Sequence, residues 1–266
     1  MQYFLHIIFA FFCLMLIVSC SDKQSSITED IEQIDIKTEA RLEATTNVLA
    51  TIPLPLEAAE LFKNEGIIYD KNYLNALDNV TNYTTNTQKA LNFGVYGVDL
   101  SYATMFDQTQ ACMQYINCSK KIAEELGLTT IFDAETIERL ENNIENKDSI
   151  LNIAEQSYRQ ADSYLKNSQQ DELAALIMAG GWIEGLYLGT RQATKNTENS
   201  QINQKINNQK KSLKALINLL ESFKNENTAF LINQLKQLDE LFIIHNQEDF
   251  IVIGNKAEKI RNQIIN

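Results

Sequence analysis

The stretch Asp171–Arg191, DELAALIMAGGWIEGLYLGTR, is the part of the chain from which the fold can be argued most directly. Apart from its ends it carries one charge, on Glu184, and it has four glycines. Gly181, Gly185 and Gly189 are spaced four residues apart, so on a helix they form a narrow strip without side chains. Polar residues do not gather on one side of this helix, and we therefore expect other helices to enclose it.

A second stretch, Lys89–Phe106 (KALNFGVYGVDLSYATMF), has the same character. It contains Gly94 and Gly97, and after its first residue its single charge is on Asp99. Glycine inside a helix costs about 1 kcal/mol relative to alanine, yet six of the nine glycines in the chain lie in these two stretches. This concentration predicts two buried helices at the centre of a domain, whose backbones closely approach each other or a ligand.

Asp99 and Glu184 are candidate site residues, because a buried carboxylate is unfavourable unless it is paired or protonated. Arg191 follows Glu184 by two turns on the same face and is a candidate cation. Three tyrosines of the two helices offer hydroxyl groups: Tyr96, Tyr102 and Tyr187. These residues form either a structural polar cluster or the polar part of a small-ligand pocket between the helices. A carboxylate pair for acid–base chemistry is a third interpretation, and no metal site is expected because no histidine or cysteine lies nearby.

The remainder of the chain is also predicted to be helical. It has two prolines, and no run alternates apolar and polar residues between turn signals as a strand would. We therefore expect an all-α fold, an irregular multi-helix bundle. Caps and apolar periodicity place helices at about 26–50, 56–64, 70–82, 88–106, 108–126, 133–146, 148–167, 171–192, 228–244 and 248–264. Residues 194–209 are either a long polar loop or the exposed start of a helix that runs to Phe223.

The pair of helices at 88–106 and 108–126 resembles a tetratricopeptide hairpin. The residues at that family's packing positions are Val95, Val98, Tyr102, Ala111, Tyr115 and Cys118. The resemblance implies an alternative architecture, a short helical solenoid, to the irregular bundle. In that family's pattern a small residue stands where this chain has Asp99, and no 34-residue repeat recurs elsewhere in the chain.

The first twenty residues are apolar and end in Ile17-Val18-Ser19-Cys20. This ending resembles the lipobox of bacterial lipoproteins, which implies cleavage before Cys20 and lipidation of that cysteine. Residues 1–19 are then a signal peptide, residues 20–26 the lipidated cysteine and a polar tether, and residues 27–266 a single all-α domain with a candidate sub-boundary near 194–200. A plain transmembrane anchor is the alternative for the first twenty residues. A membrane span at 173–190 is disfavoured by Glu184 at its centre.

The remaining composition argues against several classes of function. A net charge of −12 argues against a nucleic-acid partner and against a basic membrane-binding surface. Motifs for zinc proteases, nucleotide phosphates and serine hydrolases are absent, and His245 is the one histidine beyond the signal segment, so neither an enzyme nor a cofactor is expected. Cys112 and Cys118 lie six apart on one predicted helix, too far for a disulfide.

Two hypotheses for function follow. The first is a non-enzymatic, lipid-anchored helical protein of the cell envelope, on the periplasmic face or the outer surface, that acts as a binding or scaffold module. Its partners would be the membrane, through the lipid on Cys20, and another envelope protein. The second is a small-ligand-binding lipoprotein with its pocket between the helices at 88–106 and 171–192. Direct packing of the glycines on the facing helix would favour the first hypothesis.

Overall fold

The computed structural model describes residues 66–128, 133–153, 156, 160, 170–193, 201–243 and 246–266. All of these belong to one compact unit, residues 44–266. Every regular element among them is a helix, so the predicted all-α bundle is confirmed. The lipobox, the tether, the predicted helices at 26–50 and 56–64, residues 194–200 and His245 lie outside the described residues.

The two helices α4 (Asn86–Met105) and α5 (Thr109–Leu126) match the predicted pair to within two residues. Thr85 begins α4 with a capping box, in which its hydroxyl accepts from the Gln88 amide while the Gln88 side chain accepts from the Thr85 amide. Gly127 ends α5 in the left-handed conformation, with φ of 71°. Both ends are thus set by local sequence, which is why they could be predicted.

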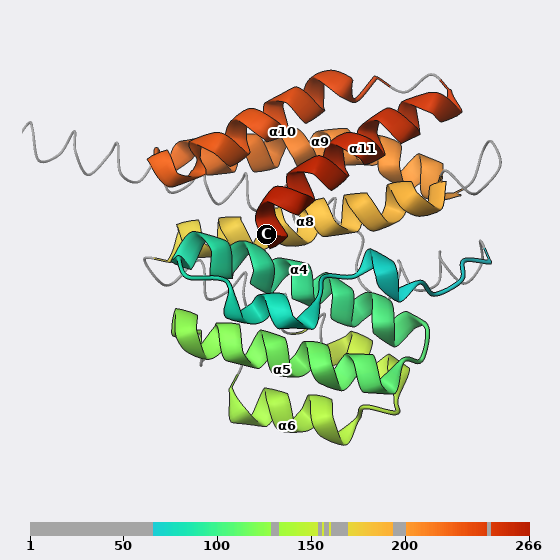
Figure 1. The fold of residues 1–266 in the computed structure, drawn as a ribbon, viewed down its shortest axis with the longest axis vertical. Helices are drawn as coiled ribbons and strands as arrows, with labels where there is room; N and C mark the ends of the chain where they lie inside the picture. The colour runs from blue at the N-terminus through green and yellow to red at the C-terminus, as the bar shows by residue number, and fades with distance from the viewer. Residues whose placement is uncertain are drawn as a thin grey trace, which may run out of the picture. The chain divides into compact units, whose positions relative to one another are not determined.

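Helix α8 (Asp171–Ala193) is the central element of the unit. In Figure 1 it lies between α4 on one side and α9 (Gln201–Ser222) and α11 (Gln247–Ile265) on the other. Helix α10 (Ala229–Leu241) covers α9 and α11, whereas α6 (Ala134–Asn142) packs on the far side of α5. The glycine-rich stretch is therefore enclosed, as its lack of a polar face predicts.

The order of packing differs from that of a solenoid. Helix α4 makes its most extensive contact with α8, ahead of its hairpin partner α5, although α4 and α8 lie far apart in the sequence. In a tetratricopeptide array each hairpin packs on the hairpin that follows it in sequence. The described helices therefore form an irregular bundle around α8.

In the part of the chain that the structure describes, α8 is the one helix long and apolar enough to cross a membrane, with a mean hydropathy of 1.3 over its best window. Within that window, 78% of the residues are buried inside the unit. The core helix of a soluble domain has the same composition, and here the apolar surface is covered by α4, α9 and α11.

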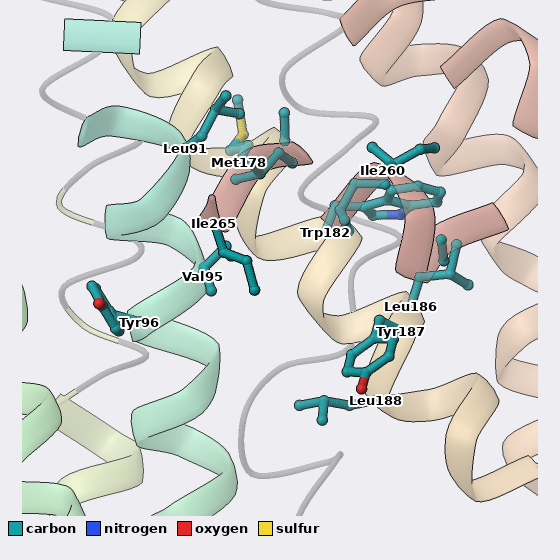
Figure 2. Close-up of a cluster of buried hydrophobic side chains, with 14 of the residues drawn as sticks. Leu91, Val95, Tyr96, Met178, Trp182, Leu186, Tyr187, Leu188, Ile260 and Ile265 are labelled. Carbon is teal, nitrogen blue, oxygen red and sulfur yellow. The ribbon is translucent and has the colours of Figure 1, made fainter. Parts of the chain in front are cut away.

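The apolar core is built on both sides of α8. Figure 2 shows Leu91 and Val95 of α4 on one side of this cluster and Trp182 of α8 with Ile260 of α11 on the other. The Trp182 indole nitrogen donates to Gln209 of α9 over 3.0 Å, so the one polar atom of that side chain is satisfied within the core.

Several of the predicted helices differ from those in the structure. Residues 70–82 were expected to form one helix, but they form two short 3₁₀ turns, η1 (Lys71–Tyr73) and η2 (Leu77–Thr81), joined by extended backbone. The reason is that the backbone groups of Tyr73, Asn75 and Ala76, where the two turns join, bond to side chains of α4, α5 and α11 instead of continuing a helix. Helix α6 ends at Asn142, four residues before its predicted end. The 201–209 part of the polar stretch is the start of α9 rather than a loop.

Candidate functional site

Glycine determines how α4 and α8 meet. A Cβ atom built on Gly94 would lie 2.0 Å from the carbonyl oxygen of Ile177, and one built on Gly180 would lie 1.9 Å from that of Leu91. These distances are far below van der Waals contact, so the two backbones touch. At this crossing no room is left for a ligand between the helices.

The predicted strip of three glycines is only partly the contact surface. A Cβ atom built on Gly181 would lie 3.4 Å from the Gly94 carbonyl oxygen, and one built on Gly189 would lie 3.8 Å from the Ile206 side chain of α9. Gly185 is exposed and has open space beside it, as does Gly97 on α4. The spacing of four was therefore a poor guide to the contact, because Gly180 rather than Gly185 approaches the partner helix.

Asp99 of α4 and Glu184 of α8 meet in the interior, close to this crossing. Both side chains are fully buried, as predicted, and they lie close enough for the charge of Glu184 to raise the pKa of Asp99. The structure therefore brings together the two carboxyl groups that the sequence singled out. It does so because α4 and α8 cross closely enough for short side chains to meet.

Arg261 of α11 is the cation that pairs with Glu184. Its Nε donates to Glu184 Oε2 over 2.6 Å, and its Nη2 donates to the Tyr73 carbonyl over 2.9 Å. The guanidinium also lies 4.5 Å from the centre of the Tyr187 ring. Arg261 was not predicted as a site residue, although it lies among the apolar positions of its helix, four residues after Ala257, and that signal could have identified it.

Arg191, the predicted partner, is bound to another carboxylate and is partly exposed. It forms an ion pair with Glu258 of α11, and its guanidinium lies 5.4 Å from the Tyr187 ring centre. Tyr187 therefore contacts a guanidinium from each of two helices, since Arg261 also packs on it. The expectation that Arg191 would balance Glu184 is wrong, because Arg261 reaches that carboxylate from a neighbouring helix.

Asp99 accepts a hydrogen bond from the segment that precedes α4. The Asn75 amide donates to Asp99 Oδ2 over 3.0 Å. The Asn75 side chain donates to the Tyr83 hydroxyl over 2.9 Å, and the backbone carbonyl of Asn75 accepts from the Tyr115 hydroxyl over 3.0 Å. Tyr83 and Tyr115 were not predicted as site residues, because nothing local connects them to Asp99.

The predicted tyrosines of α4 hold the same segment. Tyr96 donates to the Ala76 carbonyl over 3.0 Å, and the Tyr102 hydroxyl accepts from the Asp70 amide over 3.2 Å. Both rings are completely buried. In this structure the hydroxyl groups of Tyr96 and Tyr102 satisfy backbone atoms of an irregular segment, as a structural polar cluster does.

Burial dominates the electrostatics of the carboxyl pair. It raises the pKa of Asp99 well above its usual range, and the nearby charge of Glu184 raises it further, while Arg261 acts in the opposite direction. Burial also raises the pKa of Glu184, but here the contact with Arg261 opposes it directly. Of the two groups, Asp99 is therefore the one that holds a proton more tightly.

The chemistry open to this pair is limited by its surroundings. No group of three or more potential metal ligands occurs among the described residues. Full burial keeps bulk water and substrates away from both carboxyl groups. A small cavity of about 30 Å³, room for about one water molecule, opens elsewhere, beside Thr104, Cys112 and Lys147. In the folded protein the carboxyl groups of Asp99 and Glu184 can therefore hold a proton and link α4 to α8.

Comparisons with protein families, with curated proteins and with solved structures found no match to this chain.

Proposed function

We propose that this chain is a lipid-anchored helical protein of the bacterial cell envelope that acts as a binding or scaffold module and not as an enzyme. The observation that carries the proposal is the sequence Ile17-Val18-Ser19-Cys20 at the end of an apolar segment. A diacyl or triacyl cysteine gives stable membrane attachment, which a single acyl chain does not. The helical unit would then be held at the periplasmic face or the outer surface of a membrane.

The packing of the helical unit supports a scaffold over a small-ligand carrier. The glycines of α4 and α8 bring the two backbones into contact at Gly94 and Gly180. The polar groups that could have lined a pocket there are engaged with Arg261 and with backbone atoms of the segment before α4. A binding module of this kind would recognise an envelope protein through its outer surface.

Metabolic labelling with a clickable fatty acid tests the lipid anchor. The full-length protein should incorporate the label, and Cys20→Ser should abolish it, because the sulfur of Cys20 is the acylated atom. Globomycin, which inhibits the lipoprotein signal peptidase, should make the uncleaved form accumulate. Cys13→Ser is the matched control, since Cys13 lies in the same apolar segment and should not affect labelling. Labelling that survives Cys20→Ser, or depends on Cys13, would contradict the proposal.

Native mass spectrometry of the gently extracted protein tests the scaffold role. We expect complexes with a second protein and a monomer whose mass is accounted for by the chain and its acyl groups. A stoichiometric small molecule retained on the monomer would instead support the ligand-binding hypothesis. A monomer with neither a protein partner nor a small ligand would count against both.

A further inference from the structure

The buried carboxyl pair leaves a charge that must be balanced. Asp99, Glu184 and Arg261 lie together, with both carboxyl groups fully buried and Arg261 nearly so. Two carboxylates and one guanidinium sum to a charge of −1. An unbalanced charge in the interior is strongly unfavourable, so a further positive charge is needed at this position.

The hydrogen bonds of the cluster show which oxygen atoms are free to bind the missing positive charge. Asp99 Oδ2 accepts from the Asn75 amide, and Glu184 Oε2 accepts from Arg261. The two remaining oxygens, Asp99 Oδ1 and Glu184 Oε1, are buried and have no hydrogen-bond partner among the described residues. The two carboxyl groups are close enough for the charge of Glu184 to raise the pKa of Asp99. A proton carried by one of these two oxygens can be donated to the other, which gives both of them a partner.

We propose that Asp99 and Glu184 form a proton-binding site, in which one proton is held on Asp99 and donated in a hydrogen bond to Glu184. The proton resides on Asp99 because Glu184 is in direct contact with the Arg261 guanidinium, whereas Asp99 faces a neutral amide. This assignment goes beyond the proposed function and does not depend on it. The bound proton joins α4, α8, α11 and the segment before α4 at one point.

The other titratable groups around the pair do not supply the missing charge. The neighbouring phenols and thiol are neutral near pH 7, and burial raises the pKa of Tyr102 to about 12 and of Cys118 to about 11. Glu258 is already paired with Arg191 at the surface. The groups that face the pair are, by element, Tyr69, Asp70, Tyr73 and Tyr83 of the preceding segment, Tyr96 and Tyr102 of α4, Tyr115 and Cys118 of α5, Tyr187 and Arg191 of α8, and Glu258 of α11.

A metal ion fits this position poorly. It would have two oxygen ligands, whereas Mg²⁺ takes six and Ca²⁺ takes six to eight. It would also lie next to the Arg261 guanidinium, which repels it. A proton needs two oxygens and no coordination shell, so the geometry favours the proton.

The charge balance gives a rule for variants. The number of bound protons should equal the number of carboxyl groups minus the number of guanidinium groups. Wild type should bind one proton, and Asp99→Asn and Glu184→Gln should each bind none. Arg261→Gln should bind two. Asn at position 99 can still accept from Asn75 and can donate from its amide to Glu184, so it reproduces the protonated form of Asp99.

The sign of the pH dependence follows from where the proton is lost. In the unfolded chain Asp99 ionises near pH 4, whereas the folded chain keeps the proton to a higher pH. Unfolding between these two values releases a proton, so the folded state loses stability as the pH rises through this window. One proton corresponds to a tenfold fall in the folded-to-unfolded ratio for each pH unit, and the fall ends above the pKa of the folded state.

The experiment measures unfolding of the full chain, in a mild non-ionic detergent, by urea at a series of pH values. The ratio of folded to unfolded protein, taken relative to Asp99→Asn, should fall about tenfold per pH unit for wild type. Glu184→Gln should track Asp99→Asn, and Arg261→Gln should fall about twice as steeply on a logarithmic scale. Asp78→Asn is the matched control, because Asp78 is exposed on the same segment, and it should track wild type. A constant difference between wild type and Asp99→Asn across pH would overturn the proposal.

Infrared spectroscopy tests the site without requiring any variant to be stable. Wild-type protein at neutral pH should show the carbonyl stretch of a protonated carboxylic acid. That band should shift only slowly on transfer to D₂O because the group is buried. Absence of the band would overturn the proposal. So would a stoichiometric metal in the purified protein together with a loss of stability in EDTA, because a metal would then supply the charge.

Discussion

Asn75 connects more of the candidate site than any side chain that the sequence singled out. Its backbone amide donates to Asp99, its side-chain nitrogen donates to Tyr83, and its side-chain oxygen accepts from Asn79 over 2.9 Å. It is almost completely buried, at 1% exposure. A short amide in a polar loop has no sequence feature that would distinguish it from its exposed neighbours. Its role arises from where the segment lies across α4 and α5.

Replacing Asn75 should therefore destabilise the fold. We expect Asn75→Ala to lower the free energy of unfolding by about 1–3 kcal/mol, because the buried Tyr83 hydroxyl and the half-buried Asn79 amide lose their partner. Asn72→Ala, on the exposed side of the same segment, should change it by less than about 0.5 kcal/mol. Urea denaturation followed by circular dichroism measures both. Equal effects for the two variants would show that the segment is not anchored through Asn75.

The reactivity of the two cysteines of α5 can be measured residue by residue. Cys112 and Cys118 are free and buried, and burial raises the pKa of both thiols, that of Cys118 to about 11. We expect neither to react with iodoacetamide at pH 8 in the folded protein, and both to react in urea without a reductant. Mass spectrometry of the peptides separates them from Cys13 and Cys20. Labelling in urea that appears only after reduction would show that they form a disulfide.

At the scale of helices, the crossing of α4 and α8 depends on Gly94 and Gly180, which leave no space for a side chain. Each helix also has an exposed glycine, Gly97 or Gly185, beside which there is open space. The chain thus offers matched positions on the same two helices. At Gly94 and Gly180 the packing of the two helices requires glycine. At Gly97 and Gly185 nothing requires it, and glycine there only weakens the helix.

Alanine substitutions should separate these two classes. Gly94→Ala and Gly180→Ala should each cost about 3 kcal/mol or more, because a methyl group would force the backbones apart. Gly97→Ala and Gly185→Ala should each stabilise the fold by about 0.5–1 kcal/mol, because alanine is the better helix former. Thermal unfolding measures all four. Similar losses at Gly97 and Gly94 would contradict the close crossing of the backbones.

Across the whole unit, α11 connects the segments at the two ends of the described chain. The Asn92 side chain donates to the Ile264 carbonyl over 2.8 Å, and the Tyr83 hydroxyl donates to that of Ile265 over 3.4 Å. Arg261 adds its bonds to Tyr73 and Glu184. The unit should therefore unfold as one cooperative structure, since α11 contacts both α4 and α8.

Removing residues 260–266 should test whether the end of α11 is needed for cooperative unfolding. We expect the truncated protein to lose its single sharp unfolding transition, because Glu184, Asn92 and Tyr83 lose their partners together. Deletion of Asn266 alone should have little effect, since that residue is exposed. Hydrogen exchange of α4 and α8 measures the result. Undiminished protection of α4 in the longer deletion would show that α11 is not part of the cooperative unit.

Much of the candidate site was visible in the sequence. Asp99 and Glu184 could be identified as buried because each is the sole charge inside an otherwise apolar helix, and a helix without a polar face has to be enclosed. Their cation could not be identified. Arg261 lies 77 residues from Glu184, whereas Arg191 lies on the same helix, and proximity along a helix favoured the wrong partner.

The sequence by itself determined the all-α class and most helix ends, because helix propensity, capping at Thr85 and the left-handed Gly127 act over a few neighbouring residues. Only the tertiary structure decided that residues 70–82 are irregular, that Gly180 rather than Gly185 meets α4, and that Arg261 balances Glu184. Each of these depends on atoms brought together from distant helices. Their free energies come from burial and long-range hydrogen bonds, which no local pattern encodes.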